Sequence, residues 1–180
     1  MMEYRMCIEK GVKKSLSIQQ LVSCDKTDSG CNGGLPAYAL TYIANNGVVE
    51  ESLYPYVAAD TPCKIPSGTK YYIDAKTIID EDTSESIAAL KKEISTNGPI
   101  SVGFMVYKDF MSYSSGIYVK NSNTYEGGHA VLAVGYGNQN GVNFWIAQNS
   151  WGSSWGEKGY FRIKMGQCEF ENHYAWAKAK

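Results

Sequence analysis

Apolar positions in roughly the first fifty residues recur at the three- and four-residue spacing of amphipathic helices. The opening MMEYRMCIEKG has the pattern of the second half of such a helix, with Gly11 as its stop and no N-cap before it. SIQQLVSC (17–24) predicts a short helix capped by Ser15 or Ser17. LPAYALTYIANNG (35–47) predicts a longer helix that starts near its proline and ends at Asn-Gly. Because domains seldom begin in mid-helix, we expect further residues upstream of Met1.

From residue 70 onward the apolar positions favour strands separated by glycine-rich turns. A capped helix is expected within TSESIAALKKEISTNG (83–98) and a helical turn within YKDFMSY (107–113). A helical part followed by an antiparallel β part predicts an α+β fold. The expected strands are KYYIDAKTI (70–78), PISVGFMV (99–106), GIYV (116–119), GGHAVLAVGYG (127–137), VNFWIAQNS (142–150) and GYFRIKM (159–165).

Length and charge exclude several classes of function. The 180 residues suffice for one medium domain or two small lobes. The net charge of -1 gives no electrostatic reason to expect binding to nucleic acid or to an anionic membrane. No apolar run approaches the length of a membrane span, and the first residues lack the apolar region of a secretory signal.

The cysteine pattern favours disulfides over a metal site. Six residues, DKTDSG, separate Cys24 from Cys31, which is not the spacing of a zinc knuckle, and both histidines lie far away in sequence. We therefore predict no metal and no cofactor, and we expect disulfides formed in an oxidising compartment. An odd number leaves at least one thiol unpaired. The five cysteines are Cys7, Cys24, Cys31, Cys63 and Cys168.

One histidine and one asparagine form a candidate catalytic pair. His129 follows two glycines at the start of an expected strand, and Asn149 stands near the end of the next. Taken singly, each has a structural interpretation, as a surface or core histidine and as a turn-forming asparagine. Together, an asparagine oxygen can fix the tautomer of the imidazole, whose other nitrogen then faces a nucleophile and ionises a thiol. We expect a hydrogen bond between them, with Trp151 lying over it.

Four segments carry a resemblance to papain-like cysteine peptidases, the papain and cathepsin family. It covers nearly the whole chain, in order. It implies a papain-like two-lobe fold in one peptidase domain: an incomplete helical left lobe (about 1–69), an antiparallel β-barrel-like right lobe (about 70–180) and an active-site cleft between them. The segments are SIQQLVSCDKTDSGCNGGLPAYAL, ESLYPYVAADTPC, GGHAVLAVGYG and FWIAQNSWGSSWGEKGYFRI.

The resemblance implies a cysteine-type endopeptidase that hydrolyses peptide bonds through a Cys-His-Asn site. His129 matches the general base, Asn149 the residue that orients it, and Trp151 the indole that shields their bond. Gly33 and Gly34 match the Gly-Gly strand whose backbone pairs with an extended substrate. The positions that match the pocket for the substrate residue two before the scissile bond are Leu35, Pro36, Gly103 and Ala130, with His173 at its floor.

The sequence departs from the family at the nucleophile. The family's C-G-S-C-W segment does not occur in the chain. The alignment places the missing cysteine about eight residues before Met1, on the same helix, and the oxyanion-hole glutamine further upstream. Cys7 lies roughly four helical turns beyond that position. We therefore expect a fragment that is inactive alone, and a non-catalytic paralogue that binds peptides or partners remains the alternative.

The resemblance also implies the state of the cysteines and the setting of the protein. Cys24 and Cys63 match one disulfide, Cys31 and Cys7 match residues paired upstream, and Cys168 has no evident partner. No insertion resembles the paired-histidine loop of dipeptidase cathepsin B, which favours endopeptidase action. The implied partners are a peptide or protein substrate, a pro-segment and cystatin-like inhibitors. A monomer in a lysosome, a vacuole or the secreted fraction is expected, acting in protein catabolism.

Overall fold

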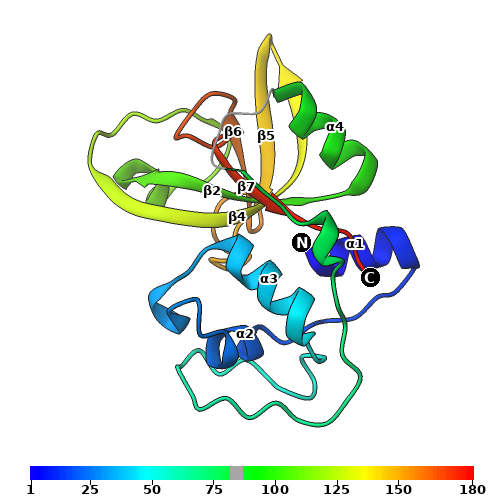
Figure 1. Cartoon of the computed structure of the whole chain (residues 1–180). Helices are drawn as coiled ribbons and strands as arrows, with labels where there is room; N and C mark the ends of the chain where they lie inside the picture. Colours follow the sequence, from blue (N-terminus) through cyan, green and yellow to red (C-terminus); the bar gives the residue numbers. More distant parts are fainter. Residues whose placement is uncertain (82–86) are drawn as a thin grey trace. The chain divides into compact units, whose positions relative to one another are not determined.

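The computed structural model describes residues 1–81 and 87–180, and its chain forms two compact units (Figure 1). The first contains Met1–Ile79 and Trp176–Lys180, and the second contains Asp80–Ala175. Helices and strands are mixed, which confirms the α+β prediction. In the described ranges, no helix has the length and apolar character needed to cross a bilayer.

Two short helices open the first unit. Helix α1 spans Met2–Lys10 and ends at Gly11, whose φ of 68° is left-handed and therefore suits glycine. Helix α2 spans Ile18–Cys24. Its N-cap is Ser17, whose Oγ accepts a hydrogen bond from the Gln20 backbone at 3.0 Å, so the capping residue is not Ser15.

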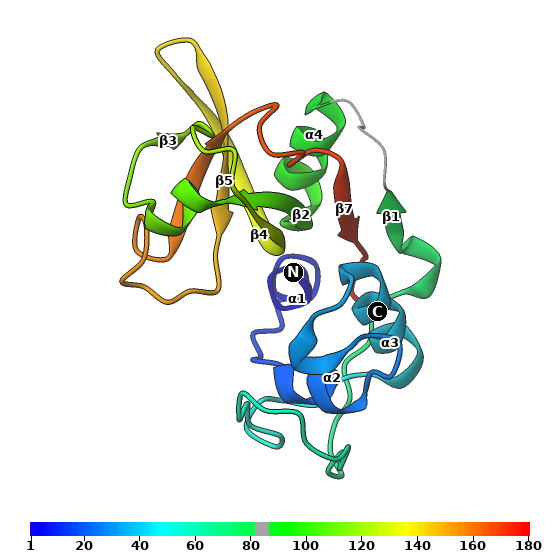
Figure 2. The same cartoon turned by 90° about the vertical axis from the view of Figure 1, so that its left-hand side faces the viewer.

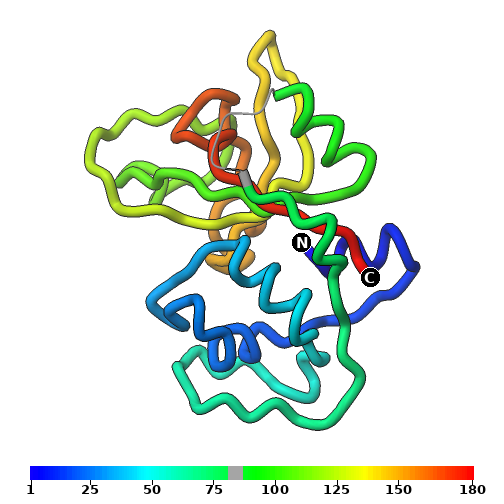
Figure 3. Tube along the Cα trace, viewed as in Figure 1, coloured from blue at the N-terminus to red at the C-terminus, as the bar shows by residue number. Residues whose placement is uncertain are grey.

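The third helix follows a tight turn. The 3₁₀ helix η1 spans Gly30–Asn32, and α3 spans Pro36–Asn46 with proline in its first turn, as the sequence predicts. A long irregular segment then continues from Gly47 to about residue 70 (Figure 3). Because irregular backbone leaves polar groups without ladder partners, these groups need side-chain partners.

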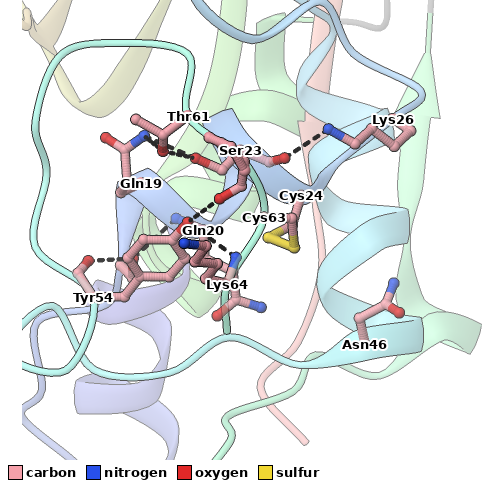
Figure 4. The surroundings of a disulfide bond; sticks show 12 residues. Gln19, Gln20, Ser23, Cys24, Lys26, Asn46, Tyr54, Thr61, Cys63 and Lys64 are labelled. Carbon is pink, nitrogen blue, oxygen red and sulfur yellow. Dashed lines mark hydrogen bonds between the residues drawn. A yellow bond between two sulfur atoms is a disulfide. The ribbon is translucent and has the colours of Figure 1, made fainter. Parts of the chain in front are cut away.

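Two fully buried glutamines of α2 provide those partners. Gln20 donates to the Gly47 carbonyl at 2.8 Å and accepts from the Val49 backbone at 2.9 Å. Gln19 donates to the Ala59 carbonyl at 2.8 Å and accepts from the Val57 backbone at 2.9 Å. The predicted disulfide between Cys24 and Cys63 is present and holds the same segment to α2 (Figure 4).

The strand predicted for residues 70–78 is wrong. Only single β-bridges occur there, at Tyr71 and Ile73, and a 3₁₀ helix η2 spans Ala75–Thr77. Asp74 causes the change, because its carboxylate accepts from the Lys76 backbone at 3.0 Å and caps that turn. The first true strand, β1, spans Ile79–Glu81.

The second unit contains most of one sheet and a helix beside it (Figure 2). Helix α4 spans Ile87–Asn97 and packs on β4, while its predicted N-cap falls within 82–86, outside the described residues. The 3₁₀ helix η3 spans Lys108–Ser112, where a helical turn is predicted. The strands are β2 Ile100–Tyr107, β3 Ile117–Tyr118, β4 Tyr125–Gln139, β5 Val142–Gln148, β6 Tyr160–Lys164 and β7 His173–Trp176.

Among the described residues the sheet order is β1-β7-β2-β4-β5-β6-β3, which is an open row and not a closed barrel. The pairs β2–β4, β2–β7, β4–β5 and β5–β6 are antiparallel. The β3–β6 pair is parallel, so the antiparallel expectation is wrong at this edge. Strand β7 is absent from the sequence prediction.

Aromatic rings fill the core of the second unit. Phe110 is fully buried, and its ring centroid lies 4.9 Å from that of Phe161 and 5.2 Å from that of Phe104. Trp145 is also buried, and its indole N–H donates to Glu171 at 2.7 Å. Rings of this size bury much apolar area and hold neighbouring strands in fixed positions.

Candidate active site

His129 and Asn149 meet across the sheet of the second unit. His129 lies within β4, opposite Phe104 of β2, and not at the strand start as predicted. Asn149 follows the last residue of β5, and its backbone N–H donates to the Gly159 carbonyl at 2.9 Å. The Nε2 atom of His129 and the Oδ1 atom of Asn149 are 2.8 Å apart, which confirms the predicted hydrogen bond.

The orientation of the Asn149 amide fixes the proton on the imidazole. Its Oδ1 also accepts from the Ser150 backbone N–H at 2.8 Å, and only the amide oxygen can accept that bond. The Nε2 atom of His129 must therefore donate, so the neutral ring carries its proton there and keeps a lone pair on Nδ1. The nearly buried Asn149 leaves its Nδ2 without a partner among the described residues.

Trp151 covers this pair. The indole stacks on the His129 ring with centroids 5.0 Å apart and planes 27° apart. The Phe110 ring packs edge to face with this indole, with centroids 5.6 Å apart. The Trp155 indole packs with it in the same way, with centroids 5.0 Å apart. A hydrogen bond beneath packed rings is less exposed to water and therefore electrostatically stronger.

The glycines of this turn serve different purposes. At Gly156, which has a φ of 57°, a Cβ would lie 2.6 Å from the Tyr160 carbonyl oxygen and 3.2 Å from the Tyr113 ring. At Gly152, which has a φ of 87°, a Cβ would meet nothing within 4 Å. The two Trp-Gly pairs, 151–152 and 155–156, lead from the sequence to the expectation that both glycines let the turn pass close beneath the rings, where a Cβ would clash; the structure shows a clash only at Gly156, and it is with Tyr160 and Tyr113. Gly156 provides space beside Tyr113, and Gly152 provides only a left-handed backbone.

Three of the predicted substrate-pocket residues stand side by side on neighbouring strands. Gly103 of β2 pairs with Ala130 of β4 on one side and with His173 of β7 on the other. A Cβ at Gly103 would lie 3.4 Å from that of His173, which is van der Waals contact, so the two residues are immediate neighbours. His173 also lies 3.7 Å from the Glu169 carboxylate, which can pair with the ring when it is protonated.

The other predicted substrate residues belong to the first unit. Gly33 has a φ of 105°, and Gly34 lies against the Asp28 carboxylate, which occupies the place of a Cβ. The same carboxylate accepts from the Leu35 backbone at 2.9 Å, just before Pro36 opens α3. Gly34 therefore lets the chain pass close to Asp28 before the helix begins, whereas Gly33 provides a backbone conformation with positive φ that suits glycine.

Neither of the two unpaired thiols with a shifted pKa has the character of an activated nucleophile. Partial loss of hydration and the neighbouring Asp60 raise the pKa of the Cys31 thiol, although the residue as a whole is exposed. Burial raises the pKa of Cys168 to about 11. Activated thiols have lowered pKa values, so both stay protonated at neutral pH.

Sequence reasoning overlooked the rings that support the pair. The ring centroid of Phe104 lies 6.0 Å from that of His129, and the ring of Phe110 packs against both Trp151 and Trp155. The alternating burial of β2 is a signal for the inward position of Phe104. No comparable signal marks Phe110, which lies in a 3₁₀ turn.

No group of three potential metal ligands occurs within residues 1–81 and 87–180.

Comparison with known proteins identifies the family. The sequence model of the papain family of cysteine proteases matches residues 1–177. The chain is 41% identical to mouse (Mus musculus) pro-cathepsin H over 172 residues, covering 92% of this chain and 51% of that protein. It is 37% identical to Dictyostelium discoideum cathepsin B over 182 residues, covering 91% and 58%. The chain thus spans about half the length of these relatives.

Solved structures agree with this result. The Carica candamarcensis cysteine protease CMS1MS2, in complex with E-64, has a TM-score of 0.85 and 32% identity, covering 98% of this chain and 83% of that one. Procathepsin B S9 from Trypanosoma congolense has a TM-score of 0.89 and 30% identity, covering 98% and 64%. The papain-like fold is thereby confirmed, and the chain belongs to the papain family of cysteine proteases.

Proposed function

We propose that the protein from which this chain comes is a cysteine-type endopeptidase that uses a Cys-His-Asn site. The observation that supports this most directly is the 2.8 Å hydrogen bond between His129 and Asn149 beneath Trp151. In this proposal His129 is the general base, Asn149 holds its ring plane and tautomer, and Trp151 keeps water from their bond.

The chemistry follows from the free Nδ1 lone pair. A cysteine thiol gives its proton to His129 Nδ1, and the thiolate adds to the carbonyl carbon of the scissile bond. The imidazolium then gives this proton to the leaving amine, which departs and leaves a thioester. Water, deprotonated by the same nitrogen, hydrolyses the thioester and restores the thiol. The Nε2–H bond to Asn149 persists through these steps and keeps Nδ1 pointed at the reacting atoms.

The nucleophile is the part that the chain does not contain. The C-G-S-C-W segment is absent from the 180 residues, and the raised pKa values of Cys31 and Cys168 argue against both as substitutes. We place the nucleophile and the oxyanion-hole glutamine in sequence outside this chain. The 180-residue chain alone is then inactive, because acyl transfer needs both groups.

The substrate is an extended peptide. Gly34 pairs with its backbone, and Leu35, Pro36, Gly103, Ala130 and His173 contact the residue two before the scissile bond. The helical part (about 1–69) and the β part (about 70–180) belong to one peptidase domain, which acts as a monomer in a lysosome, a vacuole or the secreted fraction. A pro-segment is a further partner, since relatives include proforms such as the procathepsin B of Trypanosoma congolense. Cystatin-like proteins are expected inhibitors.

The decisive test combines the transcript with an assay. We expect the reading frame upstream of Met1 to encode C-G-S-C-W, and we expect the longer product to hydrolyse a fluorogenic Phe-Arg peptide in an E-64-sensitive manner. In that product Asn149→Ala should lower kcat by about 10²-fold or more and leave KM and Tm nearly unchanged. Asn143→Ala, at an exposed position of β5, is the matched control.

Two results would contradict the proposal. An upstream frame without the cysteine would favour the non-catalytic, peptide-binding alternative, as would a longer product that binds peptides without cleaving them. E-64-sensitive turnover by the 180-residue chain itself would show that one of its own cysteines is the nucleophile.

A further inference from the structure

Trp151, the residue that covers the hydrogen bond between His129 and Asn149, is itself held by ring contacts alone. Among the residues that the structure describes, neither its backbone nor its indole N–H takes part in a hydrogen bond. Apart from the His129 ring, its indole packs against two rings, those of Phe110 and Trp155. The position of Trp151 over the bond therefore depends on these two side chains.

Both supports of Trp151 lead back to one short element, η3 (Lys108–Ser112). Phe110 belongs to this element. The indole N–H of Trp155 donates to the carbonyl of the next residue, Met111, at 3.2 Å. The rings of Phe110 and Trp155 also pack against each other, with centroids 5.1 Å apart. Element η3 thus positions Trp151 both directly and through Trp155.

Element η3 has a fixed position of its own. The Asp109 carboxylate accepts from the Tyr118 hydroxyl at 3.0 Å and from the Asn121 backbone at 2.8 Å. The Phe110 ring is fully buried and packs edge to face on the Phe161 ring, with centroids 4.9 Å apart. Close-packed interiors transmit a displacement to their neighbours. A change at Phe110 therefore reaches the rings that it contacts.

Phe110 has no ring contact with His129 in the described part of the chain, but it contacts both rings that do. One is Trp151, and the other is Phe104, whose centroid lies 5.2 Å from that of Phe110 and 6.0 Å from that of His129. Because Phe110 is fully buried, a substrate does not touch it. Any effect of Phe110 on the site must pass through its neighbours.

We propose that Phe110 is a positioning residue for His129 and that it acts through Trp151. It holds the indole over the His129–Asn149 bond, which keeps water from the Nε2 proton and fixes the plane of the imidazole. The consequence for catalysis rests on the proposed function, in which this bond keeps Nδ1 pointed at the reacting atoms. The effect on the bond itself does not depend on that function.

The first experiment measures hydrogen exchange of the His129 Nε2 proton by NMR in the 180-residue chain. The chain has only two histidines, so a His173→Gln variant assigns the signal. Phe110→Leu keeps an apolar side chain and removes the ring. We expect exchange to become about tenfold faster, because Trp151 loses one of its two supports and an aromatic pair contributes up to about that factor.

Phe170→Leu is the matched control. Phe170 is 1% exposed, belongs to the same aromatic core and packs on Phe104 with ring centroids 5.7 Å apart, but in the described ranges it contacts neither Trp151 nor Trp155. Both leucine variants should lower the melting temperature, and only Phe110→Leu should speed exchange of the Nε2 proton. Equal exchange rates in the two variants would overturn the proposal. So would a wild-type Nε2 proton that exchanges too fast to be observed.

A second comparison serves if Phe110→Leu does not fold. Trp155→Phe removes the hydrogen bond to the Met111 carbonyl at a partly exposed position. Tyr113→Phe removes two hydrogen bonds to backbone groups but keeps the ring that packs on Phe110 and Trp155. Exchange of the Nε2 proton should be faster in Trp155→Phe and unchanged in Tyr113→Phe. Equal rates in these variants would mean that attachment to η3 does not hold Trp151, which contradicts the proposal.

Kinetics of the longer product test the catalytic consequence. Phe110→Leu should lower kcat about tenfold and leave KM unchanged, whereas Phe170→Leu should change neither. An unchanged kcat in Phe110→Leu, or a raised KM at constant kcat, would overturn the catalytic role. An inactive longer product would overturn the proposed function alone, because the exchange comparison decides the positioning role without turnover.

Discussion

At the scale of single residues, Glu157 holds three parts of the second unit together. Its carboxylate accepts from Arg162 Nη2 at 2.6 Å and Nε at 3.0 Å and from the Gly116 backbone at 2.9 Å. The Arg162 hydrogen bonds, with help from Gly116 and against partial burial, hold the pKa of Glu157 below its usual range. A carboxylate with a lowered pKa stabilises the fold above its unfolded-state pKa and loses that contribution as pH falls through the folded-state pKa.

We therefore expect Glu157→Gln to lower the free energy of unfolding by about 1–2 kcal/mol at pH 7, a range reduced for partial exposure. The difference from wild type should begin to shrink below about pH 4.5 and should be smaller at pH 3 than at pH 7, because it is lost as pH falls through the lowered folded-state pKa. Urea unfolding at both pH values measures it. Glu126→Gln, at an exposed position of β4, should have little effect at either pH. An undiminished difference at pH 3 would show that the charge is not responsible.

The sequence predicted the contact between the candidate catalytic residues better than it predicted their surroundings. His129, Asn149 and Trp151 stand in motifs whose spacing carries over from the family, so their contact followed from the resemblance. Phe110 has no such signal. Whether a phenylalanine lies at the centre of an aromatic cluster depends on tertiary packing that no local pattern encodes.

At the scale of elements, α2 depends on its cap. Ser17 accepts from the Gln20 backbone at 3.0 Å and donates to the Tyr54 carbonyl at 2.6 Å, and it is 1% exposed. Ser17→Ala should lower the free energy of unfolding by about 1–2 kcal/mol, because both partners lose a buried bond. Ser15→Ala, an exposed change two residues earlier, should stay within about 0.5 kcal/mol of wild type. Equal losses in chemical denaturation would identify Ser15 as a second cap.

The elements that sequence reasoning missed share a cause. Residues 70–78 have the composition of a strand, but Asp74 caps a 3₁₀ turn there and the chain makes only isolated bridges. Strand β7 has only four residues, and its place beside β2 rests on pairing with Gly103 and its neighbours, far away in sequence. Long helices and glycine-bounded strands carry their own periodic signal, whereas short segments take their conformation from distant partners.

At the scale of the whole molecule, the order of helices and then strands was visible in the sequence, but the return of the C-terminal residues to the first unit was not. The C-terminal residues Trp176–Lys180 return to the first unit. There the Lys180 N–H donates to the Tyr72 carbonyl at 3.0 Å, and the Ala179 N–H donates to Glu9 at 2.8 Å. Contacts between residues about 100 or more positions apart leave no local pattern, so only the three-dimensional structure assigns the tail.

The disulfide joins the irregular segment of the first unit to the end of helix α2. Cys24 and Cys63 are 39 positions apart, and the segment they close has few ladder hydrogen bonds of its own. In the chain-entropy account, closing a loop of this length contributes about 3–4 kcal/mol. Replacing both cysteines by alanine should therefore raise hydrogen exchange throughout α2, α3 and residues 48–63 and should lower the melting temperature. Cys31→Ala, which removes an exposed unpaired thiol from the same unit, should change neither. Unaltered exchange in α2 and α3 without the disulfide would mean that the buried Gln19 and Gln20 networks hold the irregular segment by themselves.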